Sequence, residues 1–307
     1  MLGWLLICSL VNGNPNSFFG QYYRYQGLIT MVGYLGWYWL VAKLNRNKIL
    51  EKLGTIMTVG ASLVTLLIFF QKFAGADGRV AGFLGNPNFA GGYLALTSPF
   101  INNWWLLGII GGGIWLTGSR SALIAFGMII AVKLWQRVLN RRLLVLAGVF
   151  CLISGILIYP KREVSSFDQR GVIWQRGIEA IAKKPVFGWG VENFEVAFGS
   201  TLKQNDFDLK NIRVDKAHNE WLEMGVAGGV PAMVIYAWLC AEALLRLYRA
   251  RQVNALLCLV GFLFISAVNV VNINEYLFFY LAVGISSLST QRDTTGRARA
   301  SRAPTLR

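Results

Sequence analysis

The only histidine of the 307-residue chain, His218, lies in the stretch KAHNEWLEMG, between a charged segment and a long apolar run. Imidazole is the one side chain that changes charge near neutrality without help from its surroundings. The four cysteines all lie inside apolar runs, where they are typical core residues. Proton chemistry at neutral pH would therefore depend on His218 and a few carboxylates. The alternative interpretation is an amphipathic residue at a membrane boundary.

Arg120 is the second residue whose position could serve chemistry. It lies between two apolar runs, and the only small or polar residues beside it in the sequence are one glycine and two serines. An arginine deep in a membrane costs about 2.5–3.5 kcal/mol on insertion scales, so it usually has an anionic partner or reaches back to the interface. Of these two interpretations, we favour the binding of an anion.

The elements that would position these residues are membrane helices. Hydrophobic residues make up 55% of the chain, and apolar runs recur along nearly all of it, so the sequence predicts an all-α integral membrane protein. Several of the runs are shorter than the roughly 20 residues of a typical span and must tilt little or include flanking residues. The ten predicted spans are Met1–Val11, Gly27–Ala42, Gly54–Phe70, Phe89–Ile101, Trp104–Gly118, Ser121–Trp135, Leu143–Tyr159, Glu220–Leu245, Asn254–Val271 and Tyr276–Ser289.

The basic loops predict the orientation of these spans. With ten spans, the basic loops 43–48, 136–142 and 246–251 and the tail from Arg292 all fall on one side, which the positive-inside rule makes cytoplasmic. Both termini are then cytoplasmic. The predicted organisation is seven spans in 1–159, an extracytoplasmic loop at 160–219, three spans in 220–290 and a disordered basic tail at 291–307.

The net charge of +15 does not by itself indicate nucleic-acid binding, because many of the basic residues are these orientation signals. A basic tail beside anionic membrane lipids is the simpler explanation. We therefore expect membrane lipids as partners and no nucleic acid.

The same topology brings four unusual segments to the extracytoplasmic side. They are GFLGNPNFAGG (82–92), LTGSRSAL (116–123), an insert at 168–194 and KAHNEWLEMG (216–225). A ligand on that side could contact all four segments.

The insert predicts an amphipathic helix on the bilayer surface. Trp174, Ile178 and Ile181 recur at helical spacing and would form its apolar face. The helix should end at Lys184, because the residue before Pro185 is pushed out of the helical region, and nearby glycines permit a tight turn. The residues expected on the polar faces are Arg170, Arg176, Glu179, Lys183 and Lys184.

Acidic residues elsewhere have simpler explanations than metal binding. Asp206 and Asp208 form a D-x-D pair, but no histidine or cysteine lies close by in sequence, so we predict no metal site. Asn219 is placed to cap a helix whose first turn holds Glu220 and Glu223, which suits the positive end of the helix dipole. Either glutamate could also orient the imidazole.

Four stretches, GNPNFAGGYLAL, LTGSRSALIAF, RGVIWQRGIEAIAKKPVFGWGVENF and AHNEWLEMGVAGGVPAMVIY, resemble the successive motifs of the O-antigen ligase and polymerase superfamily of bacterial envelope glycosyltransferases. The resemblance implies an inner-membrane glycosyltransferase that needs neither metal nor cofactor. Its donor would be an undecaprenyl-diphosphate-linked glycan, and its acceptor a hydroxyl of another glycan or lipid. In this resemblance the family's functional residues correspond to Arg120, Arg170 and His218.

The residue types suit that chemistry. Arginine stays protonated and can hold two phosphate oxygens, so Arg120 and Arg170 could stabilise a departing diphosphate, while His218 orients or deprotonates the acceptor. Four further residues of the same segments are predicted to bind substrate: Arg176, Asn86, Asn219 and Glu220.

Two questions stay open at the level of sequence. Ligase and polymerase share these motifs, so the acceptor is not defined. A solute or anion transporter, such as an inorganic-carbon uptake protein, is the alternative from another functional class, in which Arg120 and the glycine-rich spans would line a path. The gathering of polar residues on one face, rather than at the midplane, favours the enzyme.

Overall fold

The computed structural model describes residues 1–300 except 23, 44–45, 138–164 and 203–213. The described residues are all-helical, and no strand occurs among them. The helices are α1 (Leu2–Asn12), α2 (Asn16–Phe19), α3 (Leu28–Lys43), α4 (Arg46–Phe73), α5 (Pro87–Thr97), the 3₁₀ turn η1 (Ser98–Phe100), α6 (Trp104–Thr117), α7 (Arg120–Arg137), α9 (Ser165–Lys183), α10 (Phe194–Thr201), α12 (Glu220–Arg249), α13 (Val253–Ser266) and α14 (Ile273–Ala300).

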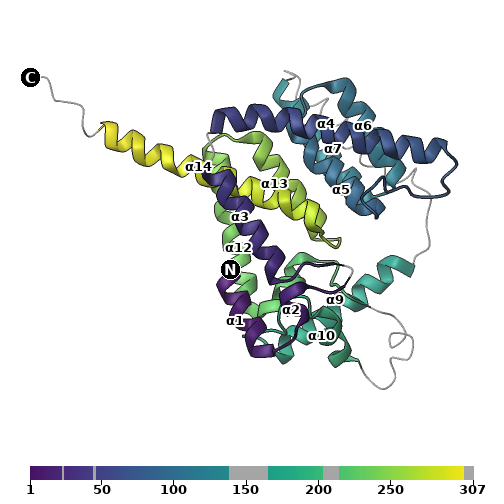
Figure 1. Ribbon diagram of the computed structural model, residues 1–307, viewed down its shortest axis with the longest axis vertical. Helices are drawn as coiled ribbons and strands as arrows, with labels where there is room; N and C mark the ends of the chain where they lie inside the picture. Colours follow the sequence, from purple (N-terminus) through teal and green to yellow (C-terminus); the bar gives the residue numbers. More distant parts are fainter. Residues whose placement is uncertain (23, 44–45, 138–164, 203–213, 301–307) are drawn as a thin grey trace, which may run out of the picture.

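The helices form two groups with a shared middle. Helices α4 to α7 gather on one side, and α1, α2, α9 and α10 gather on another (Figure 1). Helices α3, α12, α13 and α14 lie between these groups, and α14 packs against α3, α12 and α13. The middle helices therefore connect the segment around Arg120 with the segment around His218.

The predicted spans agree with the helices, with one exception that lies outside the described residues. Leu143–Tyr159 is that exception, and each of the other predicted spans falls on a helix. By length and composition, Lys52–Phe73 and Glu220–Arg249 can cross a membrane. The remaining apolar helices are shorter, so the ten-span count and its orientation stay predictions.

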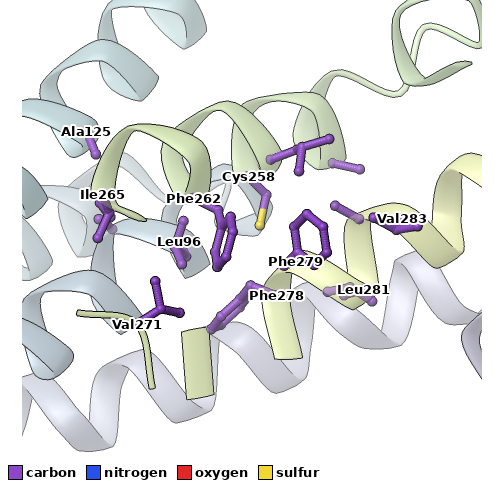
Figure 2. Packing of buried hydrophobic residues seen from close by; sticks show 14 of the residues in the cluster. Leu96, Ala125, Cys258, Phe262, Ile265, Val271, Phe278, Phe279, Leu281 and Val283 are labelled. Atoms are coloured by element: carbon purple, nitrogen blue, oxygen red, sulfur yellow. The ribbon is translucent and has the colours of Figure 1, made fainter. Parts of the chain in front are cut away.

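The larger apolar core extends from α4–α7 through the middle helices to α1, and a second, smaller core lies between α9, α10 and α12. Phe262 of α13 packs against Phe279 of α14 with ring centroids 4.9 Å apart, and both side chains are almost fully buried. Figure 2 shows Phe262 between Leu96 of α5 and Phe279. Cys258 lies in the same layer as a free, buried thiol, as Cys8 and Cys240 do elsewhere. For these three cysteines, the prediction of small core residues is confirmed.

Helix α5 is short and approaches its neighbours closely because of two glycines. A Cβ atom on Gly91 would lie 2.8 Å from Cβ of Ser119, and one on Gly92 would lie 2.1 Å from a carboxylate oxygen of Glu275. A larger side chain at Gly91 would push α5 away from the turn between α6 and α7, and one at Gly92 would push it away from α14. The FAGG part of the motif thus holds the segment around Asn86 against the segment around Arg120.

Helix α12 is interrupted in its middle. Gly228 and Gly229 have non-helical backbone angles, and Pro231 follows in the first turn of the second half. Backbone groups released by such a kink need partners in an apolar environment. The indole of Trp4 donates to the carbonyl oxygen of Gly228 at 2.8 Å. Three further hydrogen bonds join the kink to the loop after α9: Trp189 N to Val226 O (2.7 Å), Gly190 N to Ala227 O (3.0 Å) and Val230 N to Pro185 O (2.8 Å).

That loop contains the tight turn expected from the sequence. Helix α9 ends at Lys183, just before Lys184 and Pro185, and both following glycines have positive φ angles. A Cβ atom on Gly188 would lie 2.5 Å from the carbonyl oxygen of Val226. Glycine is therefore required here by backbone conformation and by the close approach of α12.

The C-terminal segment differs from the prediction. Helix α14 continues to Ala300, so residues 291–300 of the segment 291–307 that was expected to be disordered are helical. The apolar part of α14 already provides the helix nucleus, and alanine and arginine are good helix formers that extend it.

Candidate active site

His218 lies on a short loop, Val214–Asn219, that leads into α12. The indole of Trp174 in α9 donates a hydrogen bond of 3.0 Å to the carbonyl oxygen of Ala217. The amide of Ala217 donates in turn to a carboxylate oxygen of Glu223 at 2.9 Å. Both backbone groups of the residue before His218 are thus bound, one to α9 and one to α12.

The two preceding residues are held by ion pairs. Lys216 is buried and pairs with Glu192, and also with Glu223 at 3.2 Å. These two carboxylates raise the pKa of Lys216 even though burial acts to lower it. Asp215 pairs with Arg24 at 2.7 Å. Burial acts to raise the pKa of Asp215, but the hydrogen bond and charge of Arg24 prevail and lower it, so the carboxylate stays ionised.

His218 itself has a left-handed backbone, with φ at 53°. This conformation is uncommon for residues other than glycine, although histidine, asparagine and aspartate adopt it more readily than most. The next residue, Asn219, caps α12 by accepting from the amide of Leu222 at 3.2 Å, as predicted for this residue. The contacts on both sides of His218 therefore stabilise a backbone conformation that the isolated segment would seldom adopt.

The imidazole is half-buried, and its environment keeps it neutral. Burial, then the positive charge of Arg170, lowers the pKa of His218 to about 4, while Asp215 acts in the opposite direction and Arg24 adds to the lowering. Within the described part of the chain, no hydrogen bond to the ring is present. At neutral pH a ring nitrogen is thus available to accept a proton.

Arg170 approaches this histidine from α9. It lies one helical turn before Trp174, so the two side chains share a face of the helix. The guanidinium is half-buried, and burial together with the charge of Arg79 lowers the pKa of Arg170. The charge of Arg170 acts on His218, so the two residues lie within electrostatic range of each other.

Arg120 is the first residue of α7 and is exposed. The hydroxyl oxygen of its neighbour Ser121 accepts a hydrogen bond from the side-chain amide of Asn269, in the loop between α13 and α14. Asn269 also lines a small cavity of about 10 Å³ together with His218. This loop therefore connects the segment of Arg120 with that of His218.

Three other predicted substrate-binding residues have structural partners. Asn86 caps α5 by accepting from the amide of Asn88 at 2.8 Å, and Asn219 caps α12 as described. The carboxylate of Glu220 is 4% exposed and accepts from the hydroxyl of Tyr276. Glu220 and Glu223 are therefore engaged by Tyr276, Lys216 and Ala217. Substrate binding by these residues stays a prediction.

The face of α9 that contacts the protein differs from the one expected. Arg176 is buried, with an ion pair to Glu179 at 2.8 Å and a hydrogen bond to the carbonyl oxygen of Thr201 at 3.2 Å. Ile178, expected on the apolar face, is 59% exposed. The insert packs against α10 and α12. Its buried face contains Ile181, as expected, with Trp174 packed beside it, but Ile173 and Ala180 take the place expected for Ile178. An arginine at the margin of a helix face can bury its stem when its guanidinium finds partners, which helical periodicity alone does not reveal.

Two arginines near the site were missed by the sequence analysis. Arg24 holds Asp215, and Arg79 donates to the carbonyl oxygen of Thr117 at 2.8 Å and to the side chain of Asn88. A signal existed for Arg79, because it is a basic residue just before the GNPNF motif on the side where basic residues are fewer. For Arg24 no local pattern indicated a partner 191 residues away.

No group of three or more potential metal ligands occurs among the residues that the structure describes. Asp206 and Asp208 lie outside them. The described site thus consists of a neutral imidazole, several guanidinium groups and buried carboxylates that bind them or the backbone. Such a site can bind an anion through its arginines and can accept a proton on His218.

Comparison with known proteins agrees with this description. The family model described as O-antigen ligase matches residues 105–237, which include Arg120, Arg170 and His218. No curated protein matches the chain. Members of the family are glycosyltransferase-like enzymes of the bacterial inner membrane, which fits the candidate spans. Residues 105–237 therefore carry an O-antigen ligase domain, in agreement with the superfamily that the motifs resemble.

Proposed function

We propose that the protein transfers or polymerises a glycan from an undecaprenyl-diphosphate-linked donor onto an acceptor hydroxyl at the outer face of the inner membrane. The observation that carries this proposal is a neutral His218 that senses the positive charge of Arg170. The loop that carries His218 is held from several sides. A proton acceptor beside an anion-binding group is what displacement of a diphosphate requires.

The histidine and the arginines would have different roles in the reaction. The oxygen of the acceptor hydroxyl forms a bond to the anomeric carbon, and the bond between that carbon and the diphosphate oxygen breaks. The diphosphate leaves with the electron pair, and the acceptor proton goes to a ring nitrogen of His218. Arg170 and Arg120 stabilise the charge that develops on the leaving oxygens, in the way that guanidinium groups bind phosphate. The site would therefore perform this step without a metal ion.

The pKa of His218 suits a base that acts only while the new bond forms. An imidazole that ionises near pH 4 is unprotonated at neutral pH, but it binds a proton weakly. The acceptor hydroxyl becomes strongly acidic only as its oxygen bonds to carbon, so proton transfer follows bond formation. The negative diphosphate, once bound beside Arg170, would strengthen the base by favouring the imidazolium form.

The alternative of a solute or anion transporter receives no support from the family match. The described polar residues of the site lie on loops and helix ends around α12 and α9, which suits chemistry at one membrane face. The proposal leaves ligase and polymerase as two forms of the same transfer that differ in the acceptor.

Purified protein in liposomes with an undecaprenyl-diphosphate-linked glycan tests the proposal directly. We expect transfer of the glycan to an acceptor and release of undecaprenyl diphosphate, without added metal. Solute flux with no glycan transfer would contradict the proposal. Glycolipid profiles of a deletion strain separate the two forms: single repeats without long chains indicate a polymerase, and unattached long chains indicate a ligase.

A further inference from the structure

Arg79 joins two of the four motif segments. Its Nε atom donates to the carbonyl oxygen of Thr117, the last residue of α6, at 2.8 Å, and its Nη2 atom donates to the side-chain oxygen of Asn88 in α5. The amide of the next residue, Val80, donates to the carbonyl oxygen of Leu116 at 3.5 Å. The guanidinium plane of Arg79 is thus fixed between the GNPNF segment and the turn that carries Arg120.

The same guanidinium lies near the third motif segment. Burial, and then the charge of Arg79, lowers the pKa of Arg170, although the two residues come from different parts of the fold. Both side chains are half-buried, so solvent screens their repulsion only partly. An arrangement that holds two cations close together becomes favourable when an anion binds between them.

We propose that Arg79 binds the diphosphate of the lipid-linked donor, together with Arg120 and Arg170. This inference rests on the proposed function and adds a binding residue to it. Arg79 contacts Thr117, in the turn that leads to Arg120, so its guanidinium is held beside that turn. Two hydrogen bonds set its orientation before the ligand arrives, which reduces the entropy lost on binding.

Binding of inorganic pyrophosphate and of undecaprenyl diphosphate to the purified protein tests this inference without requiring transfer. Arg79→Gln should weaken the binding of both ligands by about 10-fold to 100-fold, the loss that corresponds to one or two hydrogen bonds to a charged group. Arg79→Lys keeps the charge but not the planar fork, and should weaken binding by about 10-fold. Lys72→Gln is the matched control, because Lys72 is an exposed cation at the end of α4 that contacts only nearby backbone oxygens in the described structure. It should leave both affinities unchanged.

A second variant separates ligand binding from a purely structural role. Asn88→Ala removes one hydrogen-bond partner of Arg79 but leaves its charge, so the affinities should fall by less than about threefold. Equal losses in Asn88→Ala and Arg79→Gln would show that Arg79 only joins α5 to α6, and would overturn the inference. Wild-type affinity in Arg79→Lys would also overturn it, even if Arg79→Gln does not fold.

The proposed function and this inference can fail separately. If the wild-type protein binds both diphosphates but transfers no glycan, the proposed function is wrong while the role of Arg79 in binding still stands. If transfer occurs and Arg79→Lys binds and transfers like the wild type, only the role of Arg79 is wrong.

Discussion

The indole nitrogen of Trp174 lies 3.0 Å from the carbonyl oxygen of Ala217, the residue directly before His218. This contact joins the helix that carries Arg170 to the loop that carries the histidine. This hydrogen bond therefore contributes to the relative position of Arg170 and His218, together with the packing of α9 against α12. Buried ion pairs of Lys216 hold the same loop from the other side.

Trp174→Phe should lower turnover without removing any group that touches substrate. The ring still packs, but the hydrogen bond is lost, and its net value of about 0.5–1.5 kcal/mol corresponds to a factor of about 2 to 10 in rate. Trp189→Phe is the matched control, because Trp189 donates an equivalent bond of 2.9 Å to Ala180 in the same helix. Steady-state kinetics with both variants should show the larger loss of turnover in Trp174→Phe. Equal losses would mean that the bond to Ala217 contributes only to stability.

Replacement of His218 tests its role as a proton acceptor. His218→Ala and His218→Gln should both reduce turnover by about 10² to 10⁴-fold, the usual contribution of a general base, while affinity for undecaprenyl diphosphate changes little. Glutamine keeps polarity and approximate size, so a boundary residue would tolerate it. Wild-type turnover in the Gln variant would exclude His218 from the chemistry.

The pH dependence of transfer should reflect the environment of His218. Burial and Arg170 lower its pKa to about 4, so the neutral form persists at mildly acidic pH and kcat/KM should fall only as pH drops through about 4. A bound diphosphate adds negative charge that favours the imidazolium form, so the acid limb of kcat should lie at higher pH than that of kcat/KM. Both profiles can be measured with the purified protein, and the Gln variant should lack these limbs. A limb of kcat/KM near pH 6.5 would contradict the half-buried environment.

Arg120→Lys and Arg170→Lys test the proposed binding of diphosphate by planar guanidinium groups. Both variants should insert into the membrane normally and lose most of their transfer activity, because an ammonium group cannot hold two phosphate oxygens as a fork. Arg246→Lys is a suitable control, since Arg246 lies in the last turn of α12 and pairs with Glu242 at 2.6 Å. Full transfer activity in either test variant would count against the diphosphate role of that arginine.

The predicted orientation can be tested with single cysteines in a variant whose four native cysteines are replaced. Gly199 of α10 has open space around its Cα, and Phe83 before α5 is exposed, so a cysteine at either site should react with an impermeant reagent in intact spheroplasts. Tyr248, exposed near the C-terminal end of α12, should react only after permeabilisation. The opposite pattern would reverse the orientation, and labelling of all three sites in sealed cells would contradict the topology.

Local features of the structure were predictable because they depend on neighbouring residues. Apolar runs became helices, Asn219 became the cap of α12, and α9 ended just before Pro185. Each of these follows from hydrogen bonds and backbone angles within a few residues. The sequence alone therefore determined the all-helical class and the positions of the motifs along the chain.

The partners of the site residues were decided by tertiary packing. Helical periodicity placed Arg176 on a polar face, but contact with α10 buried it against Glu179 and Thr201. Glu223 was expected either to complement the helix dipole or to orient the imidazole, yet in the fold it binds Lys216 and the amide of Ala217. A buried charge must find a partner wherever the fold offers one, and local sequence does not specify that partner.

The sequence by itself thus determined which residues are available for chemistry: one histidine, an arginine at the start of an apolar helix and another in an amphipathic helix. The tertiary structure decided what each can do. It joined Asp215 to Arg24 and Ala217 to Trp174, and it brought the charges of Arg79 and Arg170 within range of each other. These contacts join segments far apart in the chain, so they form only when the helices pack, and packing also sets the burial that keeps His218 neutral.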